Sequence, residues 1–153
     1  MNVHIRWLIR CDRPEVLSIA DGKFSEEELR ALLASRSKIG MVAESRQSGN
    51  PICGFMVYEL RKNSLEVLQF GVHRQLLRQR IGSQLISKLV SKLSTHRRSR
   101  IGFDVPENDL PMQLFLKANG FEATEVKRGE FGNCDGYRFV FRIPVLEQKE
   151  SVK

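Results

Sequence analysis

The sequence predicts a mixed α/β fold of the α+β class, in which helices pack on the faces of a mixed sheet. Apolar residues recur with a period of two in some segments and with a period of 3.6 in others. Some strand-like segments are joined by short turns, which favour antiparallel neighbours, whereas others are separated by a helical segment that allows a crossover. The 153-residue chain is also long enough to bury a core without disulfides or a metal.

The chain is expected to begin with a strand and a short helix. Residues 3–10 (VHIRWLIR) roughly alternate between apolar and polar side chains, which is typical of a strand, and we assign Trp7 to the core. Asp12 is placed to cap a short helix over residues 15–20.

A second helix and a hairpin should follow. Ser25 and Glu28 have the spacing of a capping box, and leucines on one face of the segment after them give this helix its buried stripe. Residues 39–45 and 52–60 are strand-like and flank the turn-forming residues 47–51. We therefore expect these two strands to form an antiparallel hairpin.

The middle of the chain predicts a buried strand followed by a helix. Residues 65–72 (LEVLQFGV) are apolar on both faces in the middle of the segment, as in a central strand. After them, the apolar side chains follow the helical period closely from Ile81 to Leu93, with Lys88 and Lys92 on the other face. This segment is the clearest helix in the sequence.

The last part of the chain predicts three strands and one helix. Residues 100–105 are strand-like, and Asp109 can cap a helix that ends with Asn119 and Gly120. Residues 121–127 and 137–143 are expected to be closing strands joined by a glycine-rich loop. We expect one domain over residues 1–146 and a polar tail over residues 147–153.

The composition excludes several classes of protein. The sequence contains no apolar run of 18 residues and does not open with the pattern of a secretory signal, so we expect neither membrane insertion nor secretion. Its three cysteines are widely separated and form no CxxC pair, which argues against a disulfide framework or a zinc site. We therefore expect a cytoplasmic protein.

The positive charge of the chain is concentrated in one segment. The formal net charge is +7. Residues 67–103 contain no Asp or Glu but eight Lys and Arg residues, so the rest of the chain is nearly neutral. Such a segment faces either a bound anion or an acidic partner such as nucleic acid. Nucleic-acid binding through it is expected to be weak, because no aromatic residue lies among these charges.

The segment from the central strand into the following helix is the strongest candidate for a binding site. Arg74, Arg78 and Arg80 precede the helix, and Gly82 and Ser83 open it. The first amides of a helix lack internal partners and attract phosphate, and a glycine lets a ligand approach the backbone. A solvated basic loop ahead of an amphipathic helix is the alternative interpretation.

Two stretches of the sequence resemble the GCN5-related N-acetyltransferase (GNAT) superfamily. VHRQLLRQRIGSQLI (residues 72–86) is similar to its motif A, V-x-P-x-x-Q-R-x-G-x-G-x-x-L-L. FDVPENDLPMQLFLKANGF (residues 103–121) is similar to L-E-V-R-x-x-N-x-x-A-x-x-L-Y-x-x-x-G-F of the ribosomal-protein-alanine N-acetyltransferases, and DGY (residues 135–137) to their E-D-A-Y segment. The resemblance implies a largely antiparallel central sheet with helices on both faces.

The resemblance also implies an acetyl-CoA site and a catalytic base. Asp104 stands where the family has its glutamate base, although it can instead pair with a nearby arginine. No metal is implied. The pyrophosphate of acetyl-CoA would lie on the amides at the start of the helix and its pantetheine along the preceding strand. The expected cosubstrate-binding residues are Phe70, Gly71, Val72, Arg78, Gln79, Arg80, Ile81, Gly82, Ser83 and Asp109.

Several positions depart from the family pattern. Leu77 replaces a glutamine, Arg80 replaces the first glycine, and Asp109 replaces an asparagine. Leu116 stands where the family has the tyrosine that protonates the leaving thiolate. Loss of such a general acid costs about 10²- to 10⁴-fold in rate, so the reaction would be slow rather than absent. Substitute donors are sought among Asn108, Cys134 and Tyr137.

Three functions follow from these observations. The first is an acetyl-CoA-dependent N-acetyltransferase acting on a protein or peptide amino group, including the N-terminal amine of a ribosomal protein. The second is a catalytically weak acetyl-CoA-binding module, suggested by Leu116 and Asp104. The third is a ribosome- or nucleic-acid-binding domain that uses the basic segment.

Overall fold

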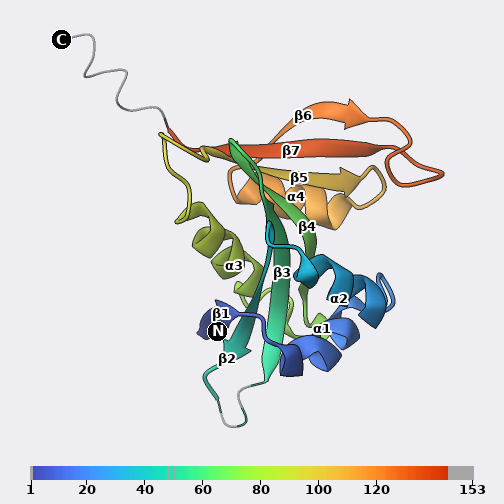
Figure 1. The fold of residues 1–153 in the computed structure, drawn as a ribbon. Helices are drawn as coiled ribbons and strands as arrows, with labels where there is room; N and C mark the ends of the chain where they lie inside the picture. Colours follow the sequence, from blue (N-terminus) through green and yellow to red (C-terminus); the bar gives the residue numbers. More distant parts are fainter. Residues whose placement is uncertain (1, 48, 50, 145–153) are drawn as a thin grey trace. The chain divides into compact units, whose positions relative to one another are not determined.

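The computed structural model describes residues 2–47, 49 and 51–144. The described residues form two compact units, one from the described parts of 2–60 with 66–91 and the other from 61–65 and 92–144. Together they contain seven strands and four α-helices (Figure 1). The mixed α/β class and the mostly antiparallel strand pairing predicted from the sequence are confirmed.

The sheet of the first unit contains the predicted hairpin. Its strands follow the order β1-β2-β3-β4. The pair β1–β2 and the hairpin β2–β3 are antiparallel, with Trp7 opposite Met41 and Val42 opposite Phe55. The strands are β1 (Val3–Trp7), β2 (Lys38–Ser45), β3 (Ile52–Leu60) and β4 (Ser64–Val72).

Helices cover both faces of β3 in this unit, as the sequence predicted. One face packs against α1 (Arg13–Ala20) and α2 (Glu26–Ala34), and Phe24 meets Phe55 there edge to face at 5.9 Å. The other face packs against α3 (Ile81–Val90). A Cβ atom at Gly54 would lie only 3.2 Å from Ile81 and 3.3 Å from Leu85, so this glycine lets the helix lie close to the strand. Figure 1 shows α3 on the opposite side of β3 from α1.

The N-terminal segment differs from its prediction. The strand ends at Trp7 instead of residue 10, and a 3-10 turn (Arg10–Asp12) follows it. Asp12 does not cap α1 with its side chain. Its carboxylate instead accepts hydrogen bonds from the Ile9 amide at 2.8 Å and from the Arg6 guanidinium at 2.8 and 2.9 Å. Trp7 is not a core residue, because 72% of its surface is exposed.

The predicted capping box at the start of α2 is present. Ser25 Oγ accepts from the Glu28 amide at 3.1 Å, and the Glu28 carboxylate accepts from the Ser25 amide at 2.8 Å. Leu29 from this helix is fully buried. The reciprocal bonds satisfy two amides that a helix start leaves without internal partners, which fixes where α2 begins.

The second unit is an antiparallel sheet with one helix. Its strands follow the order β5-β7-β6, and its core includes Phe103, Leu116 and Phe139. Asp109 caps the helix as predicted, since its Oδ1 accepts from the Met112 amide at 3.2 Å. The elements are β5 (Arg100–Pro106), α4 (Leu110–Ala118), β6 (Glu122–Lys127) and β7 (Gly136–Arg142).

The remaining expectations concern the cysteines, membrane insertion and the domain boundaries. The three cysteines Cys11, Cys53 and Cys134 are free thiols. Among the described residues, no helix is long and apolar enough to cross a membrane. The polar tail over residues 147–153 lies outside the described residues, and the single-domain assignment over 1–146 remains a prediction.

Candidate active site

The loop between β4 and α3 is held at its start by the backbone of β3. The His73 amide donates to the Cys53 carbonyl at 2.7 Å, so the end of β4 lies beside the beginning of β3. The His73 ring is also engaged, because its Nδ1 accepts from the Gln75 amide at 3.2 Å and starts a 3-10 turn (Arg74–Leu76). His73 therefore shapes the loop.

Two arginines of this loop adopt left-handed backbone conformations. Arg78 has φ 68° and Arg80 has φ 65°, and Arg80 is the residue that immediately precedes α3. Side chains other than glycine rarely adopt this region, which costs roughly 1–2 kcal/mol per residue. The conformation explains why a glycine suits position 80, where this chain has arginine. Left-handed residues in a turn also direct successive amides into a concave, anion-binding arrangement.

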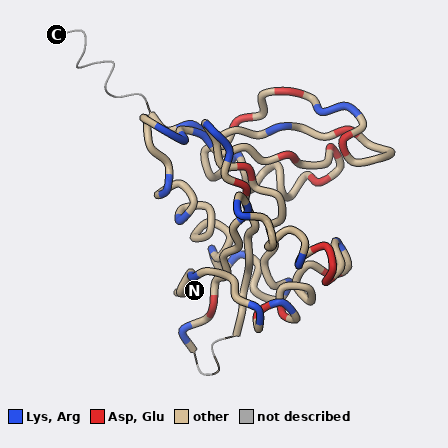
Figure 2. The backbone as a smooth tube through the Cα atoms, in the orientation of Figure 1, with Lys and Arg blue, Asp and Glu red and all other residues tan. Residues whose placement is uncertain are grey.

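The start of α3 is free of negative charge. Its first turn contains no acidic residue, and Figure 2 shows Lys and Arg but no Asp or Glu along this helix. Arg78 and Arg80 are exposed and form no ion pair with a described carboxylate, whereas Arg74 pairs with Asp21 at 2.9 Å. Because nothing negative opposes the helix dipole here, this end of α3 is suited to an anion.

The other residues expected to bind the cosubstrate in this unit lie on β4 and in the first turn of α3. Phe70, Gly71 and Val72 are half-buried on β4, and Ile81 and Gly82 are buried. Packing also explains why position 71 is a glycine, because a Cβ atom there would lie 2.7 Å from the Phe55 ring. Gln79 is exposed and Ser83 is half-buried.

Asp104 lies on β5 in the second unit and forms an ion pair. It is directly opposite Arg138 of β7 in the register, and Arg138 Nη1 donates to Asp104 Oδ1 at 3.2 Å. The Asp104 side chain is 24% exposed and the Arg138 side chain is 19% exposed, so both charges remain accessible to solvent. The arginine pairing that the sequence left open as an alternative is therefore present.

Glu130 joins this pair and was not singled out from the sequence. Its side chain, from the loop between β6 and β7, is hydrogen-bonded to Asp104. This hydrogen bond, together with burial and the charge of Asp104, raises the pKa of Glu130, while Lys127 and Arg138 act in the opposite direction. The two carboxyl groups can therefore share one proton. Only the presence of an acidic residue in the glycine-rich loop could have indicated it.

Asp135 holds the loop that carries Glu130. Its carboxylate accepts from the Gly129 amide at 2.7 Å, and its own amide donates to the Glu107 carboxylate at 2.6 Å. The Phe131 ring lies so close to Gly136 that a Cβ atom at position 136 would clash with it. These contacts keep the loop folded over the start of β7.

The remaining acid–base candidates of this unit are less suitably placed. Leu116 is fully buried, and the Asp109 carboxylate is engaged as the cap of α4. Tyr137 is opposite Val105 in the register, one step along from Asp104, so its side chain lies on the other face of the sheet. Of the other donors considered, Asn108 is exposed and Cys134 is half-buried. Within the described residues, no group of three or more His, Cys, Asp or Glu side chains could hold a metal ion.

Comparison with known proteins supports the resemblance seen in the sequence. No curated protein sequence matches this chain significantly. Solved structures match it in fold, at identities too low to carry over a substrate. Ard1 from Thermoplasma volcanium superposes with a TM-score of 0.81 at 18% identity, covering 94% of this chain and 99% of that one.

Two further neighbours have names that specify more about them. The ribosomal-protein-S18-alanine N-acetyltransferase from Escherichia coli has a TM-score of 0.79 at 16% identity, covering 94% of this chain and 96% of that one. Arabidopsis thaliana NAA60, solved in complex with acetyl-CoA, has a TM-score of 0.78 at 15% identity, with coverages of 93% and 99%. A family model described as the acetyltransferase (GNAT) family matches residues 4–121. Because this match extends over most of the sequence, and the fold agrees with it, the chain belongs to the GNAT acetyltransferase family.

Proposed function

We propose that this protein is an acetyl-CoA-dependent N-acetyltransferase whose acceptor is the amino group of a protein or peptide. The observation that carries the proposal is the start of α3, where two left-handed arginines precede a first helical turn without acidic residues. A pyrophosphate needs exposed amides and positive charge, and the residues present supply both. The acetyl-CoA bound in structural neighbours supports this choice of ligand.

The cosubstrate-binding residues follow from this placement. The amides of residues 78–83 would receive the pyrophosphate, and Arg78 and Arg80 would add charge from exposed positions. The pantetheine would lie along residues 70–72 of β4. Asp109 is the weakest of these assignments, because its carboxylate already accepts from the Met112 amide. Acetyl-CoA supplies the activated acyl group, and the protein contributes binding, orientation and proton transfer.

Asp104 is the residue that we propose as the base. Acetyl transfer forms a C–N bond and breaks a C–S bond, while one proton leaves the nitrogen and the released thiolate gains one. Asp104 would accept the nitrogen proton, and Arg138 would orient the carboxylate through its 3.2 Å hydrogen bond. A protonated Glu130 would donate to the same carboxylate. Thiols have an ordinary pKa near 8.5, so the thiolate can leave without a dedicated acid.

The acceptor that we propose first is the N-terminal amine of a ribosomal protein, in the cytoplasm. One structural neighbour is the ribosomal-protein-S18-alanine N-acetyltransferase from Escherichia coli, which supports the choice. A catalytically weak acetyl-CoA-binding module is the second candidate. The observations that favour it are the ion pair that occupies Asp104 and the burial of Leu116 at the tyrosine position.

Two measurements test the proposal. Calorimetry should show acetyl-CoA binding that Arg78→Ala and Arg80→Ala together weaken about ten-fold, because two charges near the phosphates are lost. Gly82→Asp should abolish binding, whereas Ser87→Asp, which adds the same charge at an exposed position of α3, should have little effect. No binding by the wild type at about millimolar acetyl-CoA would refute the enzyme and the binding module alike. Binding without acetylation of any member of an N-terminal peptide library would favour the module.

A further inference from the structure

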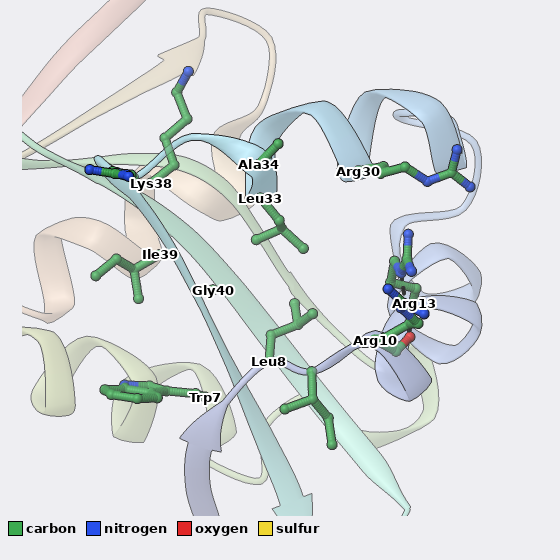
Figure 3. A pocket seen from close by; sticks show the side chains of 12 residues that line it. Trp7, Leu8, Arg10, Arg13, Arg30, Leu33, Ala34, Lys38, Ile39 and Gly40 are labelled. Atoms are coloured by element: carbon green, nitrogen blue, oxygen red, sulfur yellow. Dashed lines mark hydrogen bonds between the residues drawn. The ribbon is translucent and has the colours of Figure 1, made fainter.

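A groove in the first unit lies away from every residue discussed so far as part of the active site. Its volume is about 520 Å³, within the range of small-ligand sites. Figure 3 shows Leu8, Leu33 and Gly40 between Arg10, Arg13 and Arg30 on one side and Lys38 on the other. The groove is formed by the end of β1, the end of α2 and the start of β2. The segment after β1 is bonded to β2, because the Leu8 amide donates to the Gly40 carbonyl at 2.9 Å.

The groove extends from the middle of the first unit's sheet, at Trp7, to the end that is remote from the start of α3. Lys38, in the groove, is opposite Glu59 near the end of β3. The loop that leads into α3 is instead bonded to Cys53, at the beginning of β3. Six residue steps of extended strand lead from position 53 to position 59, which corresponds to about 20 Å. The groove is therefore separate from the proposed pyrophosphate site.

The charge of the groove has one sign. Its lining includes Arg10, Arg13, Arg30, Arg36 and Lys38, and no acidic residue. Two acidic groups beside it are paired with arginines, Asp12 with an arginine outside the groove and Glu26 with one that lines it. Asp12 is 3% exposed and bonded to Arg6, and Glu26 lies 3.6 Å from Arg30, in a pair whose side chains are both more than half exposed. An anionic partner would meet at least four unneutralised cations here.

An exposed aromatic ring lies in the same groove. Trp7 is 72% exposed and Ile9 is 53% exposed, although both are large and apolar. Large apolar side chains that are exposed next to each other and surrounded by charged residues are typical of a binding site. Trp7 is also the only tryptophan of the chain. The flat indole is a stacking surface for a planar group, which a simple anion or an acidic side chain does not offer.

We propose that this groove binds single-stranded nucleic acid, with a base stacked on Trp7 and phosphates on the surrounding arginines. Sites of this kind combine aromatic platforms with a positively charged track. The cations lie on both sides of the apolar floor, so they can bind phosphates on either side of a stacked base. A strand has phosphates on both sides of each internal base, whereas a single nucleotide does not. In the basic segment 67–103, no Phe, Tyr or Trp lies between the first charge at Arg74 and the last at Arg100, whereas this groove has both charge and an aromatic ring. A single ring predicts weak binding with strong salt dependence.

The fluorescence of Trp7 gives a direct test, because no other tryptophan contributes. A polyadenylate RNA of about eight nucleotides should quench this fluorescence to saturation at low salt. Polyglutamate and adenosine monophosphate should bind at least about ten-fold more weakly, as should an abasic strand of the same length. If the abasic strand or polyglutamate binds equally well, or if RNA binds without quenching Trp7, the proposal is wrong.

Variants separate the groove from general electrostatic attraction. With a labelled RNA, Trp7→Leu and the pair Arg13→Ala with Arg30→Ala should each weaken binding by about ten-fold. Lys88→Ala with Lys92→Ala removes the same charge at exposed positions outside the groove and should weaken binding much less. Equal losses for the two charge pairs would overturn the assignment. Unfolding curves check that each variant is folded, and acetyl-CoA affinity should be unchanged throughout, because the two sites are separate.

Discussion

Arg138 and Asp104 lie directly opposite each other on β7 and β5, with Arg138 Nη1 3.2 Å from Asp104 Oδ1. The pairing holds the carboxylate on one face of the sheet while a quarter of its surface stays exposed. Because solvent still reaches the pair, the carboxylate can accept a proton from an incoming group without unfolding the sheet.

Replacing Asp104 by asparagine should lower acetyl transfer by about 10²- to 10⁴-fold, because the base is lost while the shape is kept. Acetyl-CoA affinity should not change, since Asp104 is not proposed to contact phosphate. Single-turnover acetylation of an N-terminal peptide measures the rate of acetyl transfer, and calorimetry measures the affinity for acetyl-CoA. Glu122→Gln removes an exposed carboxylate from β6 and is the matched control. Equal rates for Asp104→Asn and the wild type would show that Asp104 is not the base.

The proton shared by Glu130 and Asp104 predicts a pH dependence. The pKa of Glu130 is raised by its hydrogen bond to Asp104. The folded protein therefore binds this proton more tightly than the unfolded chain does, and the resulting stability is present at low pH and is lost as pH rises through the raised pKa.

Glu130→Gln keeps a donor at this position at every pH. The wild type should therefore lose stability relative to Glu130→Gln as pH rises through that range. Urea unfolding of both proteins at a series of pH values measures the difference. Parallel stability curves would show that Glu130 does not share a proton with Asp104 in solution.

The parts of the fold that local chemistry dictates were predictable from the sequence. The Ser25–Glu28 capping box and the Asp109 cap form as predicted, because their partners lie within three residues. Trp7 was misassigned, because alternation identifies a strand but not which of its side chains a neighbouring element covers. Glu130 could not be found, because its partner Asp104 is 26 residues away in the sequence and only the fold brings them together.

The buried carboxylate of Asp12 should contribute more to stability than the exposed carboxylate of Asp21. Burial, the largest influence, tends to raise its pKa, but the hydrogen bonds from Arg6 and the Ile9 amide outweigh it, and the pKa is lowered. Asp12→Asn should cost about 1.5–3 kcal/mol at neutral pH, as expected for losing hydrogen bonds to a charged group. Asp21→Asn, which breaks a mostly exposed pair with Arg74, should cost less than about 1 kcal/mol.

The pH dependence of the Asp12 contribution has a definite sign. Because the folded pKa is below the ordinary value of 3.8, the contribution is complete above that value and is lost as pH falls through the folded pKa. Acid unfolding of the wild type should therefore be steeper than that of Asp12→Asn. Identical acid profiles would contradict the role given to this ion pair.

The left-handed backbone at Arg80 predicts an order of stability between two small substitutions. Glycine adopts φ 65° without strain, whereas alanine keeps the strain that arginine has. Arg80→Gly should therefore be more stable than Arg80→Ala by about 1 kcal/mol, with the loss of charge common to both. Ser83 is a matched control inside α3, where the helix reverses the order and alanine should be better than glycine by about 1 kcal/mol. Chemical unfolding of the four variants measures both differences. If alanine is the better residue at position 80 as well, the turn before α3 does not hold the left-handed conformation in solution, and the preformed anion site proposed there loses its basis.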